Sequence, residues 1–271
     1  CVAHDDGAWV PIGFPEPVVG PFLRRAMAVD DLGGLWIAYD DNDRGGATDG
    51  DGETLRLRQY LPERGWDQER EGVPGVVFGE GIDLALHDGM ALVSVATSFE
   101  KATARAERHP EVWQVYSEFI GTQVWTRVFD GAEGESKTQL VDDAGLVWDR
   151  VENTSLEVHD GTTRLVATAY QAGATEILAF DQDASGEWLS PRALDRTGRV
   201  LPTVRPRLRG GVAWWARLGG GGPEVCRAAA GAVAACTSVD GVTVGDVQPG
   251  REGARVTVLD SSRRWSVLTV E

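Results

Sequence analysis

The sequence predicts an all-β fold, and three observations lead to this prediction. Short runs in which apolar and polar residues alternate recur along the 271-residue chain, and Asp-Gly or Gly-Gly joins many of them. Alternation with a period of two is typical of half-buried strands, and these dipeptides favour tight hairpin turns. The chain also has 34 glycines and 10 tryptophans and is 42% hydrophobic, which suits a folded, turn-rich protein.

The first repeated element is a hairpin of two strands. In its best copy, "IDLALHDGMALVSVATS", an Asp-Gly turn separates two apolar runs. Copies are expected at 25–41, 82–98 and 154–170, and weaker ones at 204–220 and 246–262. Repeats of this kind are typical of architectures in which each unit packs against the next.

A second hairpin follows the first, and its last strand is expected to begin near Trp66, Trp125 or Trp188 in the first three copies. Four antiparallel strands that recur about every 50–60 residues are typical of a β-propeller blade. The sequence therefore predicts one β-propeller domain over 7–271, after an N-terminal anchor or linker over 1–6. Five four-stranded blades are expected at 21–72, 77–131, 149–194, 200–240 and 243–271.

The fifth blade runs out of chain after three strands. The segment "GAWVPIGFP" (7–15) resembles the other outermost strands, so the N-terminal strand is expected to complete this blade and close the ring. Closure removes the exposed edges of an open array. Trp265 also fits the start of an outermost strand. If it opens such a strand, the number of blades becomes four or six.

Residues 78–98, "FGEGIDLALHDGMALVSVATS", with 111–128, "EVWQVYSEFIGTQVWTRV", resemble the FG-GAP-type propeller repeat of bacterial surface proteins and integrin heads. A Phe-Gly opens its first strand, and an Asp-Gly turn follows; residues 149–190 match without the Phe-Gly. The resemblance implies a propeller fold. It does not carry over the family's calcium loop, because the turns "HDG", "RGG" and "REG" are too short.

The composition excludes some classes of partner. The formal net charge of −16 and the pI near 4.7 argue against nucleic acid, because phosphate binding requires a basic surface. No run of 18 apolar residues is present, so no membrane-spanning segment is expected. No nucleophile elbow, phosphate-binding loop or dinucleotide fingerprint occurs, so the sequence favours a non-catalytic protein.

The cysteines point to export. A cysteine at position 1 resembles the lipidated first residue of a mature bacterial lipoprotein, so a lipid on Cys1 would be the membrane attachment. The alternative is that the chain begins there by chance. Cys226 and Cys236 flank Gly231 and are expected to face each other across a hairpin as a disulfide; the alternative is two buried thiols. Lipidation and a disulfide both imply an exported protein.

Two His-Asp pairs lie in equivalent turns, His87-Asp88 and His159-Asp160. Their recurrence favours a role in the turn over acid–base chemistry.

The acidic loop 40–54 offers hard oxygen ligands for calcium at Asp41, Asp43, Asp49 and Asp51. Its spacing departs from the EF-hand register, and a solvated acidic loop is the alternative. Calcium is the one cofactor that the sequence suggests.

Two long connections between second and third strands are expected to meet on one face and bind a partner, since loops on a rigid scaffold often carry function. They are 40–53 and 98–110, with candidate residues Asp40, Asp41, Asp43, Asp49, Asp51, Lys101, Arg105, Arg108 and His109. The alternative is that the acidic and basic loops pair with each other.

The sequence thus predicts an exported, non-catalytic propeller that binds or scaffolds a protein or glycan partner. It would lie at the bacterial outer membrane, at the cell surface or in the periplasm. The alternatives are a glycan-active enzyme of the glycoside hydrolase kind and a structural subunit of an envelope assembly.

Overall fold

The computed structural model describes residues 2–5, 8–11, 25–31, 33–42, 53–67, 70–74, 81–87, 90–97, 123–129, 138–140, 150–171, 173–186, 188–201 and 204–271. All secondary-structure elements in these ranges are β-strands, and they pair in an antiparallel manner. The prediction of an all-β fold is therefore confirmed. The described residues include no helix long and apolar enough to cross a membrane.

Within the described residues the strands form an N-terminal hairpin and five larger sheets, here numbered I to V along the chain. The hairpin pairs β1 (Val2–Asp5) with β2 (Ala8–Pro11). Sheet I contains β3 (Arg25–Val29), β4 (Leu35–Asn42), β5 (Glu53–Leu61), β6 (Gly65–Trp66) and β7 (Arg70–Pro74). Sheet II contains β8 (Gly81–His87), β9 (Met90–Thr97), β10 (Gln123–Phe129) and β11 (Thr138–Leu140).

The last three sheets follow in the same order. Sheet III contains β12 (Arg150–His159), β13 (Thr162–Gln171), β14 (Ala174–Asp181) and β15 (Arg192–Asp195). Sheet IV contains β16 (Arg207–Arg209), β17 (Val212–Leu218), β18 (Pro223–Ala228) and β19 (Ala235–Ser238). Sheet V contains β20 (Thr243–Pro249), β21 (Ala254–Leu259) and β22 (Trp265–Val270).

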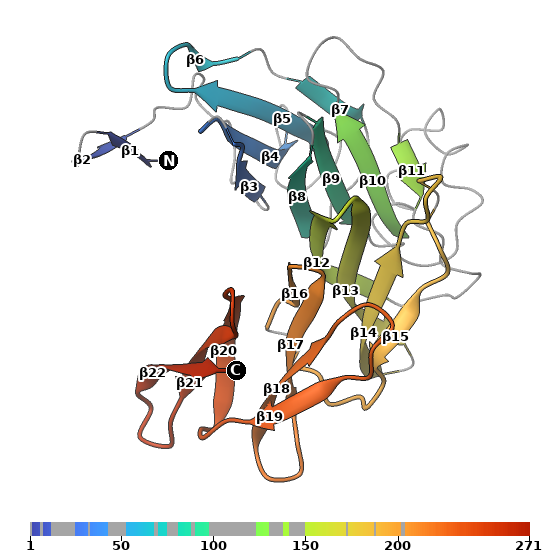
Figure 1. The fold of residues 1–271 in the computed structure, drawn as a ribbon, viewed down its shortest axis with the longest axis vertical. Helices are drawn as coiled ribbons and strands as arrows, with labels where there is room; N and C mark the ends of the chain where they lie inside the picture. The colour runs from blue at the N-terminus through green and yellow to red at the C-terminus, as the bar shows by residue number, and fades with distance from the viewer. Residues whose placement is uncertain are drawn as a thin grey trace.

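The five sheets follow one another along an arc, and the first strand of each sheet contacts the first strand of the next (Figure 1). A separate apolar cluster fills each junction. Trp36 and Leu84 meet between sheets I and II, and Leu92 and Phe180 meet between sheets II and III. Further clusters join sheet III to sheet IV and sheet IV to sheet V. The sheets therefore pack face to face in sequence order, which is the layering of propeller blades.

The predicted first hairpins are present in all five sheets. Residues His159 and Thr162 pair across Asp160 and Gly161, whose φ angles of 48° and 72° are both positive, as a two-residue type I′ turn requires. The turn at Gly210 and Gly211 has the same signs, with φ of 59° and 72°. The Asp-Gly and Gly-Gly signals in the sequence therefore placed these turns correctly.

The predicted closure of the ring by the N-terminal strand is not found. In the structure β2 pairs with β1, from Asp5 opposite Ala8 to Val2 opposite Pro11, and β22 pairs with β21. The arc stays open between sheet V and sheet I (Figure 1). The sequence explains the local pairing, because Asp6-Gly7 between the two segments is a hairpin dipeptide and a short loop costs little closure entropy. Val2–Asp5, predicted as part of an anchor or linker, is thus a strand.

The sequence predicts that a tryptophan opens the outermost strand of each of the first three blades, and for Trp125 this prediction is wrong. Trp125 lies in β10 opposite Val95 of β9, so it belongs to a third strand, and sheet II extends to Leu140 rather than 131. Trp265, by contrast, begins the third strand of sheet V, opposite Leu259, which confirms the three strands expected for the C-terminal part of this sheet. The pairing partner decides the place of a strand, and an aromatic residue at its start does not.

Candidate functional site

A groove of about 760 Å³ lies at one end of sheets III, IV and V. The β16–β17 turn, the β18–β19 connection and the β20–β21 turn contribute to its lining, together with β12. Its polar and aromatic lining residues are Glu157, Arg209, Trp214, Arg227, Arg251 and Glu252. A volume of roughly 300–1,000 Å³ is usual for sites that bind small molecules.

Trp214 and Arg227 form the part of the groove on sheet IV. Trp214 is only 5% exposed, because it packs in the apolar cluster between sheets IV and V. Arg227 stands opposite it in the β17–β18 register, and the guanidinium lies 5.5 Å from the centroid of the indole ring. A cation–π contact of this kind holds the arginine side chain in place while its N–H groups stay available for a ligand.

The β16–β17 turn is fixed by Glu157 of the preceding sheet. The backbone N–H groups of Gly210 and Gly211 donate hydrogen bonds of 2.8 and 2.9 Å to the two oxygens of the Glu157 carboxylate. A Cβ atom at Gly211 would lie 3.1 Å from the ring of His159, so a larger residue would crowd that ring as well as strain the positive φ. The turn that carries Arg209 is therefore held rigidly.

Arg164 stabilises the same turn through a backbone carbonyl oxygen. This buried side chain pairs with Asp181 at 2.6 Å and donates a hydrogen bond of 2.6 Å to the carbonyl oxygen of Gly211. Both partners of the turn, Glu157 and Arg164, belong to sheet III. The wall of the groove is thus built from two sheets that are separate in the sequence.

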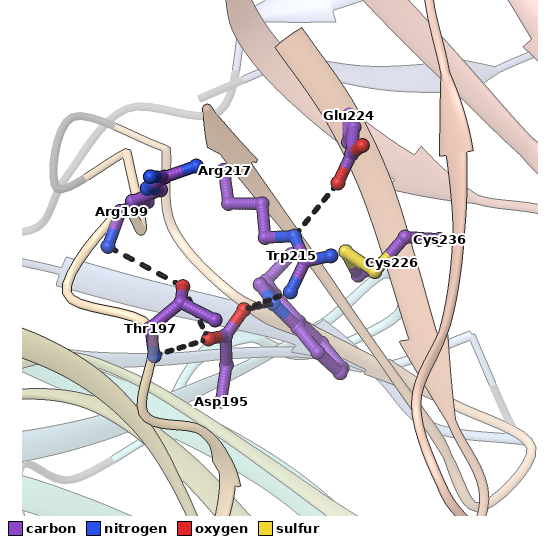
Figure 2. Close-up of a disulfide and its surroundings, with 8 residues drawn as sticks. All are labelled: Asp195, Thr197, Arg199, Trp215, Arg217, Glu224, Cys226 and Cys236. Atoms are coloured by element: carbon purple, nitrogen blue, oxygen red, sulfur yellow. Dashed lines mark hydrogen bonds and ion pairs between the residues drawn. A yellow bond between two sulfur atoms is a disulfide. The ribbon is translucent and has the colours of Figure 1, made fainter. Parts of the chain in front are cut away.

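A cluster centred on Asp195 joins sheets III and IV beside the disulfide (Figure 2). The Asp195 carboxylate accepts hydrogen bonds from the backbone N–H and hydroxyl of Thr197, at 2.9 and 2.7 Å, and from the indole N–H of Trp215 at 3.0 Å. Arg217 lies 3.4 Å from the same carboxylate and donates a hydrogen bond of 2.8 Å to Glu224.

These contacts determine the ionisation of Asp195. Burial raises the pKa of this carboxyl, but the hydrogen bonds from Thr197 and Trp215 and the charge of Arg217 outweigh burial and hold the pKa below its usual value of 3.8. The hydrogen bond to Glu224 in turn raises the pKa of Arg217. Both groups are charged at neutral pH, so the cluster is an ion pair that links the two sheets.

Cys226 and Cys236 are joined by a disulfide, as the sequence predicts. They stand opposite each other in the β18–β19 register with Cα atoms 4.0 Å apart, and Gly231 turns the connection with a φ of 70° (Figure 2). Together with Glu224 they form a set of three groups close enough to bind a metal ion. Both sulfurs are oxidised and Glu224 pairs with Arg217, so this set does not present free ligands.

A second cluster, centred on Asp83, joins sheets II, III and IV. The Asp83 carboxylate accepts a hydrogen bond of 2.6 Å from the N–H of Leu156 and lies 2.8 Å from Arg205. Arg205 also donates to the carbonyl oxygens of Thr154 and Ile82. Burial raises the pKa of Asp83, and Arg205 and the backbone N–H groups offset this only in part.

The structure describes only two of the residues predicted from the sequence for partner binding, Asp40 and Asp41. Asp40 and Asp41 lie in β4, opposite Leu55 and Thr54, so they belong to a strand rather than to a loop. Asp43, Asp49, Asp51, Lys101, Arg105, Arg108 and His109 fall outside the described residues, as does Cys1.

The two histidines singled out in the sequence occupy equivalent positions in sheets II and III. His87 and His159 each end a first strand and are exposed. His159 lies 3.4 Å from the carboxylate of Asp160, which is 90% exposed. Neither histidine lines the groove.

The groove arginines were missed by sequence reasoning. Arg209 and Arg251 stand in the first-hairpin turns of sheets IV and V, "RGG" and "REG", and Arg227 lies on a neighbouring strand. Basic residues at equivalent turns of successive repeats were a signal in the sequence. Their convergence with Arg227 depends on how the sheets pack.

No protein-family profile matches the chain, and no curated protein matches it. Solved structures resemble it in fold. The polysaccharide lyase Uly1 superposes with a TM-score of 0.53 at 13% identity, over 90% of this chain and 56% of the lyase. An α-L-arabinanase of Penicillium chrysogenum, complexed with arabinobiose, gives 0.52 at 9% identity, over 92% of this chain and 81% of the arabinanase.

A protein of unknown function from Dyadobacter fermentans gives a TM-score of 0.53 at 12% identity, over 98% of this chain and 81% of that protein. The chain spans a little over half the length of the lyase. At these identities the likeness is one of fold, and it places the chain among all-β proteins of the β-propeller type.

Proposed function

We propose that this chain is an exported β-propeller-type protein that binds a carbohydrate in the groove of sheets III to V. The observation that carries the proposal is the groove itself, with a volume of about 760 Å³, an aromatic residue in its wall and charged side chains around it. Saccharides present hydroxyl groups in fixed directions, and arginine and glutamate side chains held in place provide matching donors and acceptors.

The lyase and the arabinanase support this choice of ligand, since both are named for polysaccharide substrates and share the fold. The rigid turns around the groove support it as well. Glu157 and Arg164 hold the β16–β17 turn before any ligand arrives, and a site that is already in its binding conformation loses less entropy on binding.

The test is calorimetric titration of the protein with a panel of neutral and acidic oligosaccharides. Ala229 is exposed and lines the groove, whereas its exposed neighbour Ala230 does not. Ala229→Trp is expected to weaken binding at least about tenfold by filling the groove, and Ala230→Trp is the matched control with unchanged affinity. Equal affinities of the two variants would place the binding site elsewhere.

A second candidate is a glycan-cleaving enzyme, which the same two structures favour. Enzymes that cleave glycosidic bonds commonly use carboxyl groups, and of the two glutamates that line the groove Glu157 is bound to the β16–β17 turn, which leaves Glu252 as the candidate. If Glu252 is the acid or base, Glu252→Gln should lower the rate of reducing-end release from a cleaved polysaccharide by about 100-fold or more. Release that persists in Glu252→Gln would exclude this assignment.

Export is part of the proposal, and the Cys226–Cys236 disulfide supports it, because disulfides persist in oxidising compartments. A lipid on Cys1, the FG-GAP-type resemblance and the partner-binding patch stay predictions from the sequence. Mass spectrometry of the native N-terminus would test the lipid directly, through a mass that exceeds that of the unmodified chain.

A further inference from the structure

The arginines of the groove differ from other arginines in sheets III and IV. Arg164, Arg205 and Arg217 each pair with a carboxylate, at 2.6, 2.8 and 2.8 Å. Arg209, Arg227 and Arg251 form no ion pair with any residue in the part of the chain that the structure describes, although acidic residues outnumber basic ones by 42 to 26. Among the described residues, three guanidinium groups without an ion pair therefore surround one groove.

The carboxylates of the groove do not cancel this positive charge. Glu157 has both oxygens occupied by the N–H groups of Gly210 and Gly211, so it is directed at the turn. Glu252 is exposed and stands next to Arg251 in the β20–β21 turn. The groove therefore offers three free cationic groups against one carboxylate that is not already engaged.

The three arginines lie on different elements, which suits a ligand with more than one charge. Arg209 ends β16, Arg227 lies in β18 over the Trp214 ring, and Arg251 is in the turn after β20. A guanidinium binds a carboxylate or sulfate through two parallel hydrogen bonds, and such charge-assisted bonds are about twice as strong as neutral ones.

We infer that the ligand of the groove is an anionic saccharide, one that carries carboxylate or sulfate groups. This inference rests on the proposed function, because it names the class of carbohydrate that the same site binds. Because the three arginines lie on different elements around the groove, the orientation of the ligand as well as its affinity would depend on them.

The experiment titrates the protein with two matched pairs of oligosaccharides. Oligogalacturonate is compared with its neutral methyl ester, and κ-carrageenan oligosaccharides are compared with the same oligosaccharides after removal of the sulfate groups. At least one anionic member is expected to bind about tenfold more tightly than its neutral partner, with an affinity that falls as salt is added. The pair that shows the preference identifies the anion.

Variants separate this inference from the proposed function. Arg209→Gln and Arg251→Gln should each weaken the anionic ligand about tenfold and leave the neutral one unchanged, whereas Arg255→Gln, at an exposed position outside the groove, should change neither. Equal binding of anionic and neutral members that is still lost in Ala229→Trp would overturn the anionic inference and keep the proposed function. Binding that Ala229→Trp does not affect, or no binding at all, would overturn both. Melting temperatures of the variants verify that each one is folded.

Discussion

Asp83 and Asp195 are both buried aspartates that join neighbouring sheets beside an arginine, yet their pKa values shift in opposite directions. The Asp195 side chain is 1% exposed and accepts hydrogen bonds from Thr197 and Trp215. It also forms an ion pair with Arg217. The Asp83 side chain is 18% exposed, and the arginine beside it divides its donors between Asp83 and two backbone carbonyls.

The difference reflects the balance between burial, which favours the protonated carboxyl group, and the donors and cations, which favour the carboxylate. Burial favours the protonated form of both groups, but at Asp195 the hydrogen bonds and the cation outweigh it. At Asp83 they do not, and its pKa stays above 3.8. We therefore expect the Asp195 cluster to stabilise the fold strongly and the Asp83 cluster only weakly at neutral pH.

Removal of Asp195 should have the largest effect. Asp195→Ala leaves the buried indole N–H of Trp215 without its acceptor and Arg217 without one of its two carboxylates. Breaking a buried pair in this way costs about 3 kcal/mol in the free energy of unfolding, which denaturant titration would measure. The control is Asp260→Ala, because Asp260 pairs with the exposed Arg264 at 3.5 Å and such surface pairs contribute less than about 1 kcal/mol. A similar loss in both variants would contradict the comparison.

Loss of the disulfide next to the Asp195 cluster should have the second largest effect. The bridge closes a short loop between residues ten positions apart. In the chain-entropy model its removal costs roughly 2–3 kcal/mol of unfolding free energy. The Cys226→Ala/Cys236→Ala double variant, compared with wild type by denaturant titration, gives this value. Under reducing conditions the wild type lacks the bridge as well. Added dithiothreitol should therefore remove the stability difference between the wild type and the double variant, and it should leave the cost of Asp195→Ala in place.

Substitution of Asp83 should cost less. In Asp83→Asn the amide oxygen can still accept the hydrogen bond from Leu156, and Arg205 keeps its bonds to the Thr154 and Ile82 carbonyls. A loss of about 1 kcal/mol in unfolding free energy is expected at neutral pH, the usual contribution of one hydrogen bond. A loss as large as that of Asp195→Ala would mean that the two clusters are equivalent.

The smallest but most direct effect is in the pH dependence of stability. The lowered pKa of Asp195 gives stability that is present above pH 3.8 and is lost as the pH falls through the folded-state pKa. The raised pKa of Asp83 gives stability that is present below pH 3.8 and is lost as the pH rises through its folded-state pKa. As the pH rises from acid to neutral, the stability difference between wild type and Asp195→Asn should grow, and that between wild type and Asp83→Asn should shrink. Changes of the same sign in both would refute the assignment.

The local features of the fold were predictable from the sequence. The turn at Asp160-Gly161 and the Cys226–Cys236 pair follow from short stretches in which the residues that interact are close along the chain. The outermost strands were predicted less well. Trp125 resembles Trp66 in the sequence but lies in a third strand, because hydrogen bonding to a neighbouring strand assigns the position.

The groove could not be predicted in the same way. Glu157 and Gly210 are 53 positions apart, and Arg164 and Gly211 are 47 apart, so no local pattern relates them. The short turns "RGG" and "REG" indicated hairpins and the absence of a calcium loop, and their arginines, Arg209 and Arg251, gave no sign of the partner strand that carries Arg227.

By itself, the sequence determined the all-β class, the repeated hairpins and the cysteine pair of this protein, because periodicity and turn residues act over a few positions. The tertiary structure alone decided that Glu157 and Arg164 of sheet III fix a turn of sheet IV, and that three arginines of sheets IV and V share one groove. These outcomes depend on which strands hydrogen-bond and which sheets pack together. Such contacts are set by the free energy of the whole chain, and they produce no periodic pattern in the sequence.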